Sequence, residues 1–187
     1  MFKLFSRGKN KIENPAILLC TLGSASAFPQ DTAIYQPYPN IAEFKANTLS
    51  ELANFLSGKT FDIVHLFVEF ADDGTIEGQA GMQLVELLTK ADTKLAIFAC
   101  DNSIEKYMAA FPAGQRQGVS NMHLVLTLDR NGENFFTFFK GIFELMAKGK
   151  SMPMAWVTLA PQHDGPWMEK MPGCVFEANR GQLKFVQ

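Results

Sequence analysis

The feature of the sequence that most constrains the fold is a series of continuous apolar runs, each about as long as a β-strand. Three of them cover residues 16–22, 61–70 and 94–100, and residues 122–128 form a fourth candidate. The runs are uninterrupted rather than alternating, which is expected for strands that are covered on both faces. Because segments of crossover length separate them, the pattern predicts an α/β fold with a mainly parallel sheet.

Helical patterns occupy the segments between the apolar runs. Residues 48–51 (Thr-Leu-Ser-Glu) have the form of a capping box, and the helix that they begin is expected to stop at Gly58. Further helices are expected near residues 82–88, 104–111 and 153–160. The clearest helix spans about 133–148, where large apolar side chains recur at the spacing of one helical face. These side chains belong to Phe135, Phe138, Phe139, Ile142, Phe143 and Met146.

Two remaining segments lack so clear a pattern. Residues 24–47 are interpreted as one long connection that contains three prolines and several aromatic residues. Loops longer than ~15 residues in compact domains are usually functional or disordered. We therefore expect its aromatic side chains to pack on the surface or on a partner, although an ordered connection without a function is the alternative. At the end of the chain, residues 175–176 and 183–185 flank a turn and predict a hairpin or a pair of edge strands.

Composition excludes several classes of protein. With 187 residues, of which 47% are hydrophobic, the chain is long enough for one domain with its own core, assigned to residues 15–187 after a basic leader at 1–14. A balanced net charge of −2 argues against a nucleic-acid partner, and no apolar run approaches the ~20 residues of a membrane span. Three widely spaced cysteines suggest no disulfide framework and no zinc site. We expect no metal and no cofactor.

The first residues share some features with a secretion signal, namely several basic residues, a short apolar run and a small-residue motif at 25–27. Glu13 and Pro15 interrupt the leader, and the apolar run is barely seven residues long. We therefore predict that the protein is cytoplasmic.

Candidate chemistry lies where the predicted parallel strands end, because the carboxyl ends of such strands form the usual ligand edge. The segment 23–26 (Gly-Ser-Ala-Ser) follows the first strand, the acidic segment 69–78 follows the second, and 99–103 (Ala-Cys-Asp-Asn-Ser) follows the third. The first segment could bind an anion through backbone N–H groups, but it lacks a nucleotide-binding glycine motif.

The order of these segments resembles the caspase-like clan of cysteine peptidases and, within it, bacterial CHAT domains. The resemblance begins with the strand at 61–70, the Asp-Asp-Gly-Thr-Ile-Glu-Gly segment at 72–78 and the strand that ends in Ala99-Cys100. It covers roughly residues 60–187, and its downstream points are the following: Gly118, Asp129, Lys148-Gly149, Met154-Ala155-Trp156, Pro166-Trp167 and Val175-Phe176. The resemblance implies a three-layer α/β sandwich of the caspase/CHAT type.

In that family the earlier strand ends in His-Gly, with the histidine as general base, and the later strand ends in Ala-Cys, with the cysteine as nucleophile. Cys100 falls on the nucleophile, but Glu69 falls on the base and Phe70 on the glycine. A histidine stabilises a thiolate, whereas a neighbouring carboxylate raises the pKa of a thiol. The resemblance therefore implies a catalytically degenerate domain that acts as a protein-interaction or scaffold module.

Two other functions remain as alternatives. One is an active cysteine peptidase in which Cys100 is the nucleophile and the base comes from His65, His163 or a partner. The other is a flavodoxin-like domain that binds a small molecule at residues 23–26. His65 is also expected as a buried sheet histidine with one hydrogen bond, and His123 is expected at the amino end of its strand, away from the ligand edge.

The expected partner is a protein or a peptide, bound through residues 24–47 or through the acidic segment 69–78, which we call the acidic hairpin. A homo-oligomer is a further possibility. The candidate binding residues are Asp72, Asp73 and Asp101. Asp72, Asp73 and Glu77 could in principle ligate calcium, but they lack the spacing of an EF-hand, so no metal site is assigned.

Overall fold

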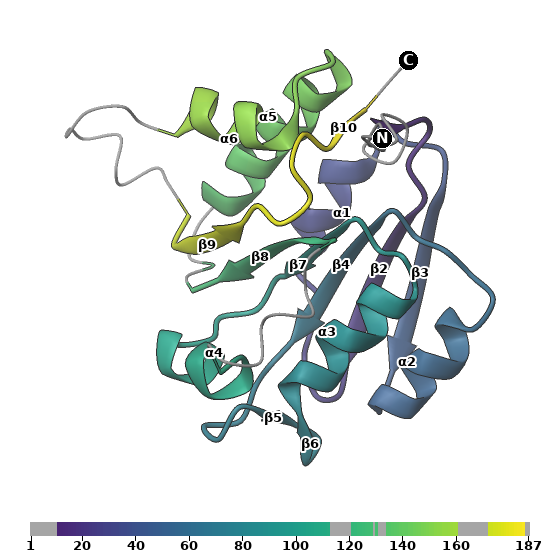
Figure 1. The fold of residues 1–187 in the computed structure, drawn as a ribbon. Helices are drawn as coiled ribbons and strands as arrows, with labels where there is room; N and C mark the ends of the chain where they lie inside the picture. The colour runs from purple at the N-terminus through teal and green to yellow at the C-terminus, as the bar shows by residue number, and fades with distance from the viewer. Residues whose placement is uncertain (1–10, 113–120, 129, 131–133, 161–171, 186–187) are drawn as a thin grey trace, which may run out of the picture.

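A six-stranded, mostly parallel sheet forms the centre of the protein (Figure 1). The computed structural model describes residues 11–112, 121–128, 130, 134–160 and 172–185. The strand order is β3-β2-β4-β7-β8-β9, and only β9 runs antiparallel to its neighbour. The strands are β2 (Ile17–Leu22), β3 (Ile41–Ala46), β4 (Ile63–Val68), β7 (Leu95–Phe98), β8 (His123–Thr127) and β9 (Cys174–Glu177). The prediction of an α/β fold with a mainly parallel sheet is confirmed.

The four apolar runs of the sequence become the four interior strands β2, β4, β7 and β8. All six residues of β4 are buried, as are all four of β7 and all five of β8. Side chains of a strand alternate between the two faces of the sheet. A strand that is covered on both faces must therefore be apolar at almost every position, which explains why the runs are continuous.

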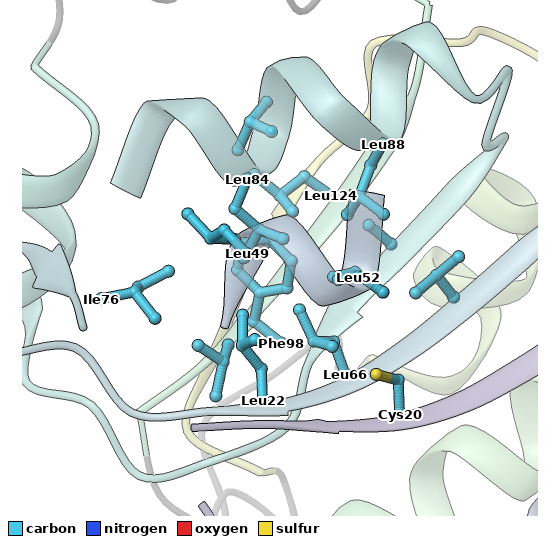
Figure 2. Packing of buried hydrophobic residues seen from close by; sticks show 14 of the residues in the cluster. Cys20, Leu22, Leu49, Leu52, Leu66, Ile76, Leu84, Leu88, Phe98 and Leu124 are labelled. Carbon is cyan, nitrogen blue, oxygen red and sulfur yellow. The ribbon is translucent and has the colours of Figure 1, made fainter. Parts of the chain in front are cut away.

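Helices cover both faces of the sheet, which gives three layers (Figure 1). One face packs against α2 (Leu49–Leu56), α3 (Gly81–Lys90) and α4 (Ile104–Ala110), and the other packs against α1 (Pro29–Tyr35), α5 (Asn134–Ala147) and α6 (Met152–Leu159). The core between the sheet and α2, α3 and α4 is called the first core. Figure 2 shows part of it, in which Leu52 and Leu84 of the helices approach Leu66 and Phe98 of the sheet. None of these helices combines the length and apolarity that crossing a bilayer requires, within the residues described.

The expected helix signals agree with the structure. The Thr48 hydroxyl accepts a hydrogen bond from the Glu51 backbone N–H at 3.2 Å, and the Glu51 carboxylate accepts one from the Asn47 backbone N–H at 2.7 Å. The second bond reaches one residue further back than a standard capping box does. The apolar stripe of α5 is buried at all six expected positions.

The interpretation of residues 24–47 as a long connection is wrong, because the segment contains α1 and the edge strand β3. α1 has only seven residues and begins at Pro29, so it is too short for a helical period to be evident. Two of the segment's aromatic side chains pack inside the molecule. Tyr35 is fully buried, and the Tyr38 ring lies 5.5 Å from that of Phe185.

The two segments predicted at the end of the chain as a hairpin or a pair of edge strands do form strands, but they do not pair with each other as a hairpin. β9 pairs with β8, whereas β10 (Lys184–Phe185) pairs in parallel with β1 (Lys11–Ile12). Ile12, which lies in the expected leader, is only 3% exposed and packs in the core on the face of the sheet that carries α1, α5 and α6. The downstream points of resemblance at residues 118, 129 and 166–167 lie outside the described residues.

Candidate functional site

Cys100 lies two residues beyond the end of β7, at the carboxyl edge of the sheet. The residue is only 2% exposed. Burial, together with the negative charge of Glu69, raises the pKa of the thiol to about 12. The Cys100 side chain is therefore a neutral thiol at neutral pH, which is a poor nucleophile.

Glu69 follows β4 directly and is exposed to solvent. Its carboxylate is near enough to Cys100 to act on the pKa of the thiol, and the direction of that effect is upward. A general base for a cysteine nucleophile must lower this pKa. Glu69 thus opposes the formation of a thiolate.

The backbone at this edge is closed by the side chain of Asn102, which is 2% exposed. Its Oδ1 accepts a hydrogen bond from the Phe70 N–H at 2.9 Å, and its Nδ2 donates one to the Val68 carbonyl at 3.0 Å. The Phe70 N–H is therefore already used inside the protein. Phe70 itself is 2% exposed and points into the first core, where the resemblance would place a glycine.

Two further side chains extend this closure to β7 and β8. The Thr127 hydroxyl lies 2.9 Å from the Phe98 carbonyl and 2.5 Å from the Cys100 carbonyl, and the Tyr107 hydroxyl donates to the Thr127 carbonyl at 2.8 Å. The sequence patterns assigned no role to Tyr107 or Thr127 and included Asn102 only as part of the segment 99–103. The available signal was position, because Asn102 follows one apolar run and Thr127 lies near the end of another.

His65 is remote from Cys100. The register of β4 and β7 pairs His65 with Ile97, so Cys100 lies three residues further along, roughly 10 Å at ~3.3 Å per residue. This separation is far beyond hydrogen-bond reach. His65 is completely buried, as expected, but it has two polar partners instead of the one expected.

The two partners of His65 both come from α1. The Tyr35 hydroxyl is 2.7 Å from Nδ1, and the Asp31 carboxylate is 2.8 Å from Nε2. Burial lowers the pKa of His65, and the opposing influence of Asp31 is smaller. The neutral imidazole then donates from Nε2 to Asp31 and accepts at Nδ1 from Tyr35, so neither nitrogen is available to a nucleophile.

Arg130 completes this buried group of side chains. Its guanidinium donates to the Asp31 carboxylate at 2.5 Å, and its side chain is 1% exposed. Phe28 and Phe135 lie against the guanidinium, with ring centroids 4.5 and 3.7 Å away. We call Asp31, Tyr35, His65 and Arg130 the buried polar group. Sequence analysis missed Asp31, Tyr35 and Arg130, although Asp31 and Tyr35 have the four-residue spacing of one helical face.

His123 does not supply a base either. His123 begins β8 at the amino edge of the sheet, as expected, and its Nδ1 accepts a hydrogen bond from the Arg180 N–H at 3.3 Å. Burial lowers the pKa of His123 to about 4. His163 lies outside the described residues.

The acidic segment forms a small antiparallel hairpin of β5 (Thr75–Ile76) and β6 (Gln79–Ala80). Asp73 accepts hydrogen bonds from the backbone and hydroxyl of Thr75, which lower its pKa, and Asp72 forms an ion pair with Lys106 of α4 at 3.4 Å. Asp101 is exposed. No group of three or more His, Cys, Asp or Glu side chains is arranged to hold a metal ion in the described part of the chain.

The segment 23–26 follows β2, beside the point where the strand order reverses. The order of the parallel strands, β3-β2-β4-β7-β8, matches that of flavodoxin-like folds, whose ligands bind at this reversal. Glu77, however, lies against Gly23 so closely that a β-carbon on Gly23 would be 2.5 Å from its Oε1. A carboxylate at this position disfavours an anionic ligand.

A hollow of about 280 Å³ lies between β2, β3 and α1, on the face of the sheet that carries α1. Thr21, Thr32, Glu43, Lys45 and Phe67 contribute to its lining, and Cys100 and Glu69 do not. The hollow is therefore separate from the edge where the resemblance would place chemistry.

Comparison with known proteins assigns no family to this arrangement, since neither the protein-family models nor the curated proteins contain a match to the chain.

Proposed function

We propose that the protein is a catalytically degenerate domain of the caspase/CHAT type that acts as a protein-interaction or scaffold module. The observation that carries this proposal is the state of Cys100, a buried thiol whose pKa is raised to about 12. A peptidase of this kind needs the opposite, namely an accessible thiolate beside an imidazole.

The neighbouring groups support the same conclusion. Glu69, which stands where the resemblance would place the base, raises the pKa of Cys100, and the Phe70 N–H is bonded to Asn102 rather than left open for an oxyanion. An oxyanion site requires N–H donors that are free to bond the developing charge. The active-peptidase alternative would need both a new base and a rearranged edge.

The contact surface that we propose consists of the acidic hairpin and the exposed side of α4. Ile104 and Met108 are 51% and 64% exposed and lie one helical turn apart on α4. The ion pair between Asp72 and Lys106 joins this helix to the hairpin. Exposed apolar side chains beside carboxylates suit a partner that is both basic and apolar.

The test of catalytic competence is alkylation of Cys100 by iodoacetamide, followed by peptide mass mapping. A pKa raised from 9.0 to about 12 reduces the thiolate fraction, and hence the labelling rate, by about 1,000-fold at neutral pH. We expect sluggish labelling of Cys100 in the folded protein and rapid labelling after unfolding. Rapid labelling at about pH 6.5 that disappears in Cys100→Ser would contradict the proposal.

The contact surface is tested by a photo-crosslinking side chain placed at Met108, with the same side chain at Glu86 of α3 as a matched exposed control. We expect a discrete adduct from position 108 only, lost when Asp72 and Asp73 are both changed to lysine. An adduct pattern that is the same at positions 108 and 86 would show that this surface is not the contact.

A further inference from the structure

β3 lies at one margin of the central sheet. It stands at the end of the strand order, and its one neighbour among the described residues is β2 (Figure 1). An unpaired strand edge presents a row of N–H and C=O groups that can pair with another strand. The edge therefore requires either protection or a partner.

The hydrogen bonds at the two ends of the β2–β3 ladder show which backbone groups face outward. The Ile17 N–H donates to the Asn40 carbonyl at 2.8 Å, and the Gly23 N–H donates to the Ala46 carbonyl at 3.0 Å. Alternate residues of a parallel strand face the same neighbour. Even-numbered residues of β3 therefore face β2, and Ile41, Glu43 and Lys45 direct their N–H and C=O groups to the side away from β2.

The side chains of β3 differ between the two faces of the sheet. Glu43 and Lys45 are exposed, lie on the same face and both border the hollow beside α1. Phe44 lies on the opposite face, where it is partly buried and stacks on Phe55 with ring centroids 3.9 Å apart. The strand thus carries one charge of each sign on one face and an aromatic side chain on the other.

We propose that β3 pairs antiparallel with β3 of a second copy of the chain, about a two-fold axis at Phe44. In this register Glu43 lies opposite Lys45 of the second copy, and Lys45 lies opposite its Glu43. These are the residues whose backbone groups face outward, so each such pair also exchanges two backbone hydrogen bonds. The pairing joins the two central sheets into one.

The charges of Glu43 and Lys45 favour this register over the two neighbouring registers. An axis at Glu43 would place two glutamates opposite each other, and an axis at Lys45 would place two lysines opposite each other. Like charges directly opposite in a sheet are destabilising. An axis at Phe44 also brings the two Phe44 side chains together on the face that carries the Phe44–Phe55 stack. The proposal concerns the opposite margin from β9 and does not depend on the state of Cys100.

The test is the mass of the protein in solution, measured by sedimentation or light scattering across a concentration series up to about 100 µM. We expect the unmodified chain to reach about twice the 20.8 kDa of one copy. Glu43→Lys and Lys45→Glu should each weaken self-association by tenfold or more, because each creates two like-charged pairs. Mixing these two variants should restore a dimer, because each cross-strand pair then joins a lysine of one variant to a glutamate of the other.

Glu86→Lys on α3 and Lys148→Glu after α5 serve as matched controls, because both positions are exposed and lie away from β3. They should leave the association unchanged. A chain that remains monomeric over the whole series would overturn the proposal. A dimer that both β3 variants leave intact would also overturn it, and would place the interface on another surface. Neither outcome bears on the alkylation of Cys100, so this proposal and the proposed function fail separately.

Discussion

Asp31 shows how a single buried carboxylate between two partners can stabilise the folded protein. It accepts a hydrogen bond from Arg130 and another from His65, and none of the three side chains is more than marginally exposed. Arg130 also lies between Phe28 and Phe135. Because water cannot reach this group, the charge of Arg130 depends on Asp31 for its compensation.

At this scale we predict that Asp31→Asn lowers the free energy of unfolding by about 3–5 kcal/mol, because it leaves the Arg130 guanidinium buried without a counter-charge. Urea unfolding measures the change. Adding Arg130→Gln removes the second charge and should recover part of the loss. Asp72→Asn, which affects an ion pair whose aspartate is 98% exposed, should cause no measurable change. Equal effects of the Asp31 and Asp72 changes would contradict this account.

At the scale of elements, the acidic hairpin packs closely against α4 at Gly74. A β-carbon on Gly74 would lie 2.2 Å from the backbone nitrogen of Ala110, and Gly74 has a φ of +77°. Gly78 has a similar φ of +74° but has no atom within 4 Å of the same position. The two glycines therefore separate the effect of backbone conformation from the effect of close packing.

We expect Gly78→Ala to cost about 1–2 kcal/mol of unfolding free energy, the penalty for a left-handed conformation with a β-carbon. Gly74→Ala should cost at least about 2 kcal/mol more, because α4 must also move away from the hairpin. Chemical denaturation measures both, and near-ultraviolet circular dichroism reports the displacement around Tyr107. Similar costs for the two variants would show that the hairpin does not pack closely on α4.

At the scale of the whole molecule, burial of two histidines couples folding to pH. His65 and His123 are both fully buried, and burial lowers the pKa of each, that of His123 to about 4. The unfolded chain has ordinary histidine pKa values near ~6.5, so it binds more protons than the folded chain below that pH. The contribution of the two histidines to the free energy of unfolding is therefore fully present above about pH 6.5, and it decreases as the pH falls toward 4.

We predict that His123→Gln flattens this pH dependence. The pKa difference for His123, from 6.5 to about 4, corresponds to a loss of about 3 kcal/mol at most by pH 4. Unfolding free energies measured from about pH 7.5 to pH 4.5 should converge for the variant and the unmodified protein as the pH falls. Parallel curves would show that His123 titrates normally in the folded state.

The sequence could predict the elements whose environment is uniform along their length. The strands β4, β7 and β8, which form within the apolar runs, are buried at every position, and the stripe on α5 is buried at all six. α1 and β3 could not be recognised in the same way. α1 is too short to show a period, and β3 carries Glu43 and Lys45 at an edge that the core does not cover.

The sequence by itself determined the layered α/β architecture, because strands that are covered on both faces must be apolar throughout. It also determined that no histidine follows β4, where Glu69 stands instead. Only the tertiary structure decided the rest, because it depends on contacts between residues far apart in the chain. Asp31 meets Arg130 across 99 positions, and Asn102 bonds Phe70 across 32. A local sequence pattern cannot predict such contacts, because the same polar residue is found whether its hydrogen-bond partner is water or another buried side chain.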